Sequence, residues 1–402
     1  MPSSTSFFRL ALILGLLTAV GPFAIDMYLP ALPTIGNDLG ASTTAVQMSL
    51  LAFFISTGVA QIIVGPLSDK FGRKVLLYAG LALFAAGSVG AALAPDVDWL
   101  IAFRFVQGLG ASAGMVVPRA VVRDLHTGPD AARLMSLLML VFSISPILAP
   151  LVGSMVIASF GWRAVFWAVT IAAGLGAILL ATSLEETHSR ERRLGRSLRS
   201  SIAGYRVLLR DRNFLGLSLI GGFGISSFFI YLANSSFVLI DHYGLTPTSY
   251  SLFFSLNAVA FFAMSQLTGM LTQRFGLRVV VRAAVMAFAA IMVAMAAVMS
   301  TGAQSLWVMS TFLFFGYGFL GLVIPTTSVL AMEEHGEIAG TASALMGTLH
   351  LGTGVVAMGI SGLFFDGTPL PMVIGIATCG VVALVLTLVT LPARQRIAVP
   401  AE

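Results

Sequence analysis

The sequence predicts an all-α integral membrane protein with twelve transmembrane helices in two pseudo-symmetric six-helix bundles. Three observations support this fold class. The composition is 57% hydrophobic and only 10% charged, whereas a soluble chain carries about 25% charged residues. Twelve apolar segments reach the length of about 20 residues that a membrane helix needs. A charged turn after the second segment recurs half a chain later, which indicates that the two halves are parallel repeats.

The twelve predicted spans cover residues 8–28, 44–66, 75–94, 99–120, 133–157, 162–183, 213–239, 249–272, 279–300, 304–329, 338–362 and 371–392. They are too long for the strands of a membrane barrel, which have about 10 residues of alternating polarity. The first span lacks a short apolar core followed by a cleavage site. We therefore expect it to be retained and not removed as a signal peptide.

The basic residues predict how the chain is oriented. Lys and Arg concentrate in the cytoplasmic loops of membrane proteins. With the N-terminus placed inside, all of the 22 Lys and Arg residues except Arg104 and Arg163 fall in or beside cytoplasmic segments. The sequence therefore predicts that both termini are cytoplasmic. The same distribution explains the basic pI of about 9.7 by topology and not by nucleic-acid binding.

The longest polar stretch separates the sixth predicted span from the seventh. It contains eight arginines between Arg190 and Arg212. We therefore predict three parts: an N-terminal six-helix bundle at 1–184, a cytoplasmic linker at 185–212 and a C-terminal six-helix bundle at 213–402. A solvated linker is the simpler interpretation, and contact with anionic lipid head groups is the alternative.

Residues 65–74 read GPLSDKFGRK and connect the second and third predicted spans. Glycine tolerates positive φ and Pro66 fixes its own φ, so the composition favours a tight turn. Residues 269–278 read GMLTQRFGLR, 204 positions later, at the equivalent place in the second half. The two copies share the first Gly, the third Leu, the Phe-Gly pair and a final basic residue. This repeat supports a duplicated transporter architecture with the substrate site between the halves.

Five short motifs carry a resemblance to a known family. They read DMYLPALP at 26–33, GPLSDKFGRK at 65–74, RFVQGLG at 104–110, RAVVRD at 119–124 and PILAPLVG at 146–153. From about residue 10 to 390, the chain resembles the major facilitator superfamily and, within it, the Bcr/CflA group of drug:proton antiporters. One departure is Ala149, where the general antiporter motif has glycine before the proline. The resemblance implies a monomer in the bacterial inner membrane that exports phenicol- or bicyclomycin-like antibiotics in exchange for protons.

Two charged side chains, Asp26 and Arg104, lie within predicted spans. A charge at the centre of a membrane helix costs about 2.5–3.5 kcal/mol on insertion scales, so each is a candidate functional residue. Asp26 is either a proton-coupling carboxyl or a structural residue that anchors the helix break before Pro30. Arg104 cannot release its proton, but it can favour the ionised form of a nearby carboxyl. The resemblance implies that Arg104 acts in proton coupling, and a purely structural contact with helix-end carbonyls is the alternative.

His350 in the eleventh predicted span is a third proton-coupling candidate. Related exporters tend to carry glutamine here, whereas this chain reads GTLH at 347–350. Histidine titrates near physiological pH. His350 is therefore either a second proton site or a polar cavity-facing side chain that replaces an amide. The other histidines are not spaced as metal ligands, and the single cysteine, Cys379, excludes a multi-cysteine metal site.

The charged turn and the end of the fourth span predict a cytoplasmic gate. We expect Asp69 and Arg73 to pair with charges at the end of that span or with a helix end, and to separate when the halves rock. Because the second copy has Gln273 and Leu277 at these two places, the gate should be asymmetric. The alternative is that the charges only set the topology. The predicted gate residues are Gly65, Asp69, Gly72, Arg73, Arg123 and Asp124.

A mostly apolar cavity with a few polar groups is expected for a drug-sized ligand. The predicted substrate contacts are Met27, Tyr28, Phe54, Met115, Phe142, Tyr231, Asn234 and Asn257. Helix packing or lipid contact is the alternative for each aromatic residue. Pro146 and Pro150 should bend or loosen the fifth span, and Gly153 should let it pack closely against a partner.

The sequence therefore predicts a proton-coupled secondary multidrug exporter that works by alternating access and is not an enzyme. No glycine run continues into Gly-Lys-Ser or Gly-Lys-Thr, so ATP-driven transport is not expected, and neither is a cofactor. One alternative is a proton-coupled symporter or exporter of a sugar or other metabolite. Another is a transport-inactive membrane sensor or scaffold. The expected partners are a small drug-like substrate, protons and the lipid bilayer.

Overall fold

The computed structural model describes residues 4–126, 128–187, 204–335 and 338–392 of the 402-residue chain. Within these ranges the regular structure is helical throughout. Twelve helical segments there are long and apolar enough to cross a membrane. The all-α fold class and the twelve predicted spans are therefore confirmed. The central part of the predicted linker, 188–203, lies outside the described residues.

The first span continues beyond its predicted end at residue 28, after a break in the helix. Its regular helix ends at Asp26, and a short 3-10 turn and a second helix carry the span on to Asp38. Pro30 and Pro33 lie in the first turns of η1 and α2, where the N–H group that proline lacks is not needed for a bond within the helix. The described helices of the first half are α1 (Ser4–Asp26), η1 (Leu29–Ala31), α2 (Leu32–Asp38), α3 (Thr43–Phe71), α4 (Arg73–Ala92), α5 (Val97–Leu125), α6 (Gly128–Phe160) and α7 (Arg163–Ser183).

The second half also begins with an irregular span, because the first helix ends in a π-helical segment. The predicted span at 249–272 is divided: one helix ends at Gln266 and a shorter one begins at Thr268. The described helices are α9 (Arg212–Ser236), η3 (Phe237–His242), α10 (Pro247–Gln266), α11 (Thr268–Phe275), α12 (Leu277–Ser300), α13 (Leu306–Met332), α14 (Ala339–Leu363) and α15 (Pro369–Thr390).

The two copies of the repeated turn have the same backbone device. Gly72 separates α3 from α4 with φ of +104°, and Gly276 separates α11 from α12 with φ of +81°. Both glycines occupy the eighth position of their motif. Side chains disfavour positive φ, so glycine is required where the chain leaves one helix and starts the next. The sequence repeat therefore corresponds to a repeated turn.

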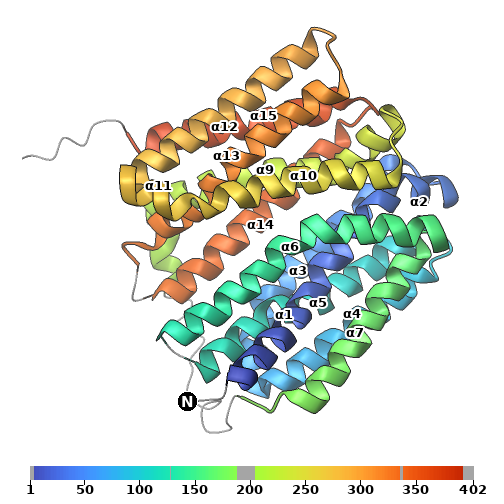
Figure 1. Ribbon diagram of the computed structural model, residues 1–402, viewed down its shortest axis with the longest axis vertical. Helices are drawn as coiled ribbons and strands as arrows, with labels where there is room; N and C mark the ends of the chain where they lie inside the picture. Colours follow the sequence, from blue (N-terminus) through green and yellow to red (C-terminus); the bar gives the residue numbers. More distant parts are fainter. Residues whose placement is uncertain (1–3, 127, 188–203, 336–337, 393–402) are drawn as a thin grey trace, which may run out of the picture. The chain divides into compact units, whose positions relative to one another are not determined.

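Small residues let the helices of the first half pack closely. The neighbouring pairs are α3 with α5, α4 with α5 and with α7, and α1 with α6 (Figure 1). A side chain at Gly87 of α4 would lie 2.5 Å from the backbone nitrogen of Gln107 in α5. Such close backbone approach is typical of membrane helices. In the second half, α12 packs against both α13 and α15 (Figure 1).

Contacts divide the chain into two compact units that differ from the predicted halves. The first contact unit contains Met1–Leu198, Leu232–Val259 and Met358–Thr368, and the second contains the remainder. Ends of α9, α10 and α14 thus belong to the first contact unit: α9 bonds to α3, α10 bonds to α6, and α14 bonds to α9. The Nε2 atom of Gln47 donates to the Oδ1 atom of Asn234 at 3.0 Å, for example.

Candidate functional site

Asp26 is the last residue of α1 and is only 5% exposed. The Oγ atom of Ser145 in α6 donates a hydrogen bond of 3.1 Å to its carboxylate. α6 packs closely against the residue that follows α1, because Gly153 has no side chain there. A Cβ atom at Gly153 would lie 2.7 Å from the Cα atom of Met27. The helix break and a glycine contact therefore place one hydroxyl beside one buried carboxyl.

Arg104 is fully buried in α5. One guanidinium nitrogen donates to the Oε1 atom of Gln107 at 2.5 Å and to the carbonyl oxygen of Ala24 at 3.3 Å. Gln107 in turn donates to the Oγ atom of Ser88 at 2.7 Å. The Nε and Nη2 atoms of Arg104 have no hydrogen-bond acceptor among the described residues. The cation is thus hydrogen-bonded on one edge only.

Aromatic rings surround the rest of this guanidinium. Its central carbon lies 4.5 Å from the ring centroids of Tyr28 and Phe53, and 5.9 Å from that of Phe166. A hydrogen bond of 2.7 Å between the hydroxyls of Tyr28 and Ser49 fixes the first ring. The faces of aromatic rings attract cations, and this attraction is stronger when the cation is desolvated. We call Tyr28, Phe53 and Phe166 the arginine cage.

Asp26 and Arg104 form no ion pair with each other in the described chain. They are nevertheless linked, because Arg104 bonds to the carbonyl of Ala24 in the last turn of α1, two residues before the carboxyl. The arginine cage was not predictable from the sequence. Tyr28 lies in the break after α1, whereas Phe53 and Phe166 come from α3 and α7, and of the three only Tyr28 was a predicted substrate contact.

A second charged cluster lies where α3 turns into α4. Arg73 is 4% exposed. Its Nε atom donates to the Oδ2 atom of Asp124 at 2.8 Å, and its Nη1 atom pairs with Asp69 and with the Oγ atom of Ser68, each at 2.5 Å. We call Asp69, Arg73 and Asp124 the arginine cluster. The expected pairing of the turn with the end of the fourth span is therefore present.

Two further predicted gate residues, Gly65 and Arg123, are not among the three residues of the arginine cluster. A side chain at Gly65 would meet nothing within 4 Å, so packing does not require glycine there. Arg123 is exposed at the end of α5. Gly72, by contrast, is required by its positive φ.

Sequence reasoning missed Glu186. Its two carboxylate oxygens accept hydrogen bonds from the backbone N–H groups of Arg73 and Lys74, at 3.0 and 3.2 Å. Thr187 donates to the Oδ2 atom of Asp124 at 3.3 Å. An acidic residue directly after the sixth span was a visible signal, since helix N-termini attract carboxylates. Nothing in the sequence indicated which helix it would meet, more than 100 residues away.

His350 lies in α14 against α9, within the second contact unit. A side chain at Gly221 of α9 would lie 2.8 Å from the Nε2 atom of His350 and 3.0 Å from the Oγ1 atom of Thr327 in α13. Nε2 is buried and has no hydrogen-bond partner among the described residues. Gly221 therefore makes room for the imidazole of His350.

Tyr231 lies in the same contact unit and packs against Tyr317, with ring centroids 5.6 Å apart.

Asn234 bonds to side chains of two other helices in the first contact unit. It accepts from Gln47 of α3 and donates from Nδ2 to the Oγ atom of Ser361 in α14 at 2.9 Å. We call these three residues the amide network.

Ser251 and Ser255 of α10 donate to carbonyl oxygens of α6 at 2.8 and 2.7 Å. α6 itself remains one helix through Pro146 and Pro150.

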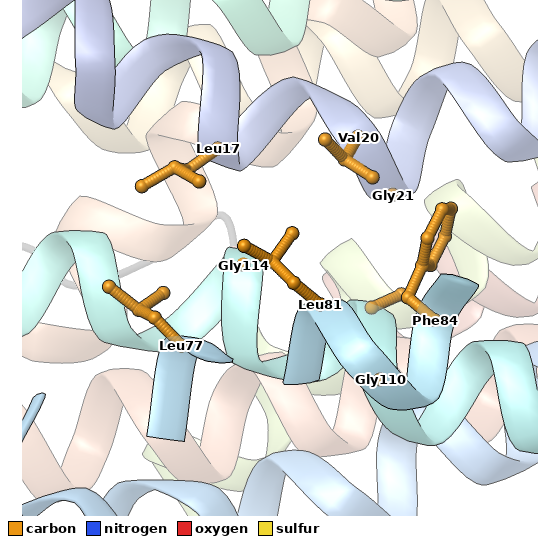
Figure 2. Close-up of a pocket in the computed structure, with 9 residues that line it drawn as sticks. Leu17, Val20, Gly21, Leu77, Leu81, Phe84, Gly110 and Gly114 are labelled. Carbon is orange, nitrogen blue, oxygen red and sulfur yellow. The ribbon is translucent and has the colours of Figure 1, made fainter. Parts of the chain in front are cut away.

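The predicted substrate contacts differ in how deeply they are buried. Six are buried, namely Met27, Tyr28, Phe54, Tyr231, Asn234 and Asn257, whereas Met115 and Phe142 are half-buried. Figure 2 shows a small apolar pocket where α1, α4 and α5 meet, lined by residues such as Leu17, Leu81 and Phe84. It has room for about one water molecule, and no predicted substrate contact lines it.

No metal-binding group of three or more side chains occurs in the part of the chain described.

Comparison with known proteins identifies relatives along nearly the whole chain. The family model described as Major Facilitator Superfamily matches residues 14–358. The chain is 37% identical over 377 residues to the uncharacterized MFS-type transporter YdgK of Bacillus subtilis, covering 92% of each chain. It is 28% identical over 385 residues to a bicyclomycin resistance protein homolog of Haemophilus influenzae, covering 95% of this chain and 96% of the relative. It is 30% identical over 361 residues to multidrug resistance protein D of Escherichia coli, covering 87% of each.

Solved structures share the fold. The crystal structure of a D-xylose-proton symporter superimposes with a TM-score of 0.74 at 18% identity, covering 95% of this chain and 97% of the other. A bacterial homolog of the human lysosomal transporter Spinster superimposes with a TM-score of 0.71 at 17% identity, covering 96% and 95%. At these identities the likeness concerns the architecture alone.

Proposed function

Because the chain belongs to the major facilitator superfamily of membrane transporters, we propose that it is a proton-coupled exporter of small, moderately apolar, drug-like compounds. The motif resemblance to the Bcr/CflA group is confirmed by relatives named for resistance to bicyclomycin, multiple drugs and chloramphenicol. Phenicol- and bicyclomycin-like antibiotics are therefore the substrates to test first. We further propose a monomer in the bacterial inner membrane, with both termini cytoplasmic and no cofactor.

The observation that carries this proposal is the setting of Asp26. It is the one buried acidic side chain among the described residues, and it lies within a membrane span. An acid at such depth costs about 2.5–3.5 kcal/mol on insertion scales, so its presence calls for a function. A hydroxyl from Ser145 is its hydrogen-bond partner. A buried carboxyl with a neutral partner is suited to bind a proton and release it again.

Arg104 supplies the positive charge in this mechanism. It keeps its own proton, and two of its nitrogens have no acceptor in the described chain. When Asp26 loses its proton, the guanidinium offers unused donors near the end of α1. We therefore assign Asp26 the proton and Arg104 the response to the charge that forms. His350 is a second residue proposed to act in coupling, with its buried Nε2 atom as the reactive position.

The cytoplasmic gate is proposed to comprise the arginine cluster with Gly65, Gly72 and Arg123. A buried arginine at a helix junction does not readily move away from its ion-pair partners, because an unpaired buried charge is strongly unfavourable. The cluster therefore moves as a unit or exchanges partners. Such exchange suits a loop that opens and closes one side of a transporter.

The eight predicted substrate contacts remain our proposal for the residues that surround the binding site, with Asn234 acting through its amide network and not by direct contact with the substrate. Because six of them are buried, the compound reaches them only when helices separate. Alternating access provides this separation during each cycle.

The decisive experiment measures export of chloramphenicol and bicyclomycin from proteoliposomes with an imposed proton gradient. We expect efflux of at least one compound to stop when the gradient is collapsed, and the Asp26→Asn variant to lose the gradient dependence. Efflux that is unchanged without a gradient contradicts proton coupling. Accumulation in place of efflux contradicts the direction of transport.

A further inference from the structure

Four residues after α7 pack onto the first half. Leu184 is 5% exposed, Glu186 bonds to the start of α4, and Thr187 bonds to Asp124 at the end of α5. We call Leu184–Thr187 the α7 tail. Leu184 was predicted to end the N-terminal bundle, and residues 185–187 to begin the solvated linker. The structure instead connects its side chains to the arginine cluster.

Glu186 provides α4 with a cap that its own sequence lacks. The first N–H groups of a helix have no partner within the helix, and the residue before α4 is Gly72, which has no side chain to offer. The carboxylate of Glu186 accepts from two of these groups, in Arg73 and Lys74. A negative charge is also stabilised at a helix N-terminus by the helix dipole.

The α7 tail contacts both partners of the Arg73–Asp124 ion pair. Glu186 holds the backbone of Arg73, while the side chain of Arg73 reaches Asp124 at 2.8 Å. Thr187 donates to the same Oδ2 atom of Asp124 at 3.3 Å. The position of the guanidinium therefore depends on where the α7 tail holds the start of α4.

No equivalent is expected in the second half. The repeat offset of 204 residues places Thr390, at the end of α15, at the position of Glu186. Threonine carries no charge, and the repeated turn has already lost the acid and the arginine. At this offset, the second half therefore has no acid at the position of Glu186.

We propose that Glu186 is a positioning residue of the transport cycle, which holds the start of α4 so that Arg73 engages Asp69 and Asp124. This inference rests on the proposed function, because it takes the arginine cluster as the gate. The connection between the halves then begins after Thr187, and the α7 tail moves with the gate. Glu186 touches neither substrate nor proton in this scheme, so it affects the rate of gating and not substrate affinity.

The first test compares Glu186→Ala and Glu186→Gln with Glu185→Ala in proteoliposomes that carry chloramphenicol. Glu185 is the adjacent, exposed acid, so it controls for loss of one negative charge. We expect Glu186→Ala to lower the maximal efflux rate by about tenfold, in line with the loss of charge-assisted hydrogen bonds, with KM unchanged. Glu186→Gln keeps one acceptor and should lose less. An equal rate in Glu186→Ala and Glu185→Ala overturns the proposal, as does a change confined to KM.

The second test does not depend on transport. Amide hydrogen exchange should be about tenfold faster at Arg73 and Lys74 in Glu186→Ala than in the wild type, because two hydrogen bonds are lost. It should be unchanged in Glu185→Ala. Unchanged exchange in Glu186→Ala overturns the capping contact even if transport falls. If the wild type exports neither compound, the proposed function fails, and the exchange result still decides whether Glu186 caps α4.

Discussion

Ser145 of α6 donates a hydrogen bond of 3.1 Å to the carboxylate of Asp26 at the end of α1. This single contact makes α6 sensitive to the protonation state of Asp26, because an ionised carboxylate accepts a stronger hydrogen bond than a neutral one. α6 also packs on the backbone of Met27 through Gly153. Proton binding and the packing of α6 are therefore linked at one place in the fold.

We expect Ser145→Ala to reduce proton-driven export without abolishing it. The variant removes one hydrogen bond to a carboxyl, worth about 1.5–3 kcal/mol when charged. Asp26→Asn should abolish the dependence on the proton gradient altogether. The measurement is efflux of chloramphenicol at imposed gradients of different size. Ser143→Ala, which removes a more exposed hydroxyl from the same helix, is the control and should behave as the wild type.

The arginine cage predicts that Arg104→Lys is not a conservative change. The guanidinium carbon lies 4.5 Å from two ring centroids, and one of its nitrogens donates to both Gln107 and Ala24, whereas an ammonium is a compact, strongly hydrated ion. We expect at least about a tenfold loss of export, since cation–π contacts at desolvated sites contribute about 2 kcal/mol or more. Phe53→Leu tests the cage separately, and it should weaken export while leaving Asp26 and Arg104 in place. Full activity of Arg104→Lys contradicts the role given to the cage.

Two glycines of the repeated turn motif should respond in opposite ways. Gly72 has φ of +104° and ψ of 155°, a region that is almost exclusive to glycine and costs other residues about 1–3 kcal/mol. Gly72→Ala should therefore lower the thermal unfolding temperature in detergent. Gly65 lies inside α3 with open space around it, and alanine favours helices over glycine by about 1 kcal/mol. Gly65→Ala should be neutral or stabilising, and a loss of export in this variant assigns Gly65 a role in movement.

The sequence predicted some of these features and not others. The twelve spans followed from the length of the apolar segments, and the repeated turn followed from glycines at matching positions. The pairing of Arg73 with Asp124 was expected because both residues lie at cytoplasmic helix ends in the predicted topology. The arginine cage and the cap from Glu186 join residues far apart in the chain. Such contacts depend on how helices rotate about their axes, which composition and spacing do not determine.

Asp211 predicts an acid-sensitive contact in the second half. It precedes α9, accepts a hydrogen bond from the backbone N–H of Asn213 at 2.8 Å, and lies 2.7 Å from the Nε2 atom of His335. Burial raises the pKa of the Asp211 carboxyl, but the bonds from His335 and the backbone outweigh it, so the pKa is lowered. A lowered pKa stabilises the fold above the unfolded value of about 3.9, and this contribution is lost as pH falls through the folded pKa.

The unfolding temperature of Asp211→Ala should therefore differ from that of the wild type at pH 7, and the difference should shrink as the pH falls below the unfolded pKa of about 3.9. At neutral pH the variant loses a helix cap, which costs about 1 kcal/mol. Below the folded pKa the wild-type carboxyl is protonated and its advantage disappears. Asp366→Ala is a useful comparison, because hydrogen bonds from Thr368 also lower the pKa of that exposed carboxyl. A difference between Asp211→Ala and wild type that is constant from pH 7 to 3 contradicts the argument.

The amide network distinguishes two roles for Asn234. If Asn234 mainly contacts substrate, Asn234→Ala raises KM and Gln47→Ala does not. The structure favours a different outcome, because Asn234 is fully buried and already bonds to both Gln47 and Ser361. Breaking this network leaves buried polar atoms without partners, at a cost of about 1–3 kcal/mol. We therefore expect both variants to lower the unfolding temperature and alter the maximal efflux rate, with KM unchanged. The stability effects of substitutions within one hydrogen-bond network are not additive, so the double variant should lose less stability than the two single variants combined.

Ser300→Ala, at an exposed hydroxyl, controls for loss of a polar group. Additive losses together with a raised KM in Asn234→Ala alone support the substrate contact instead.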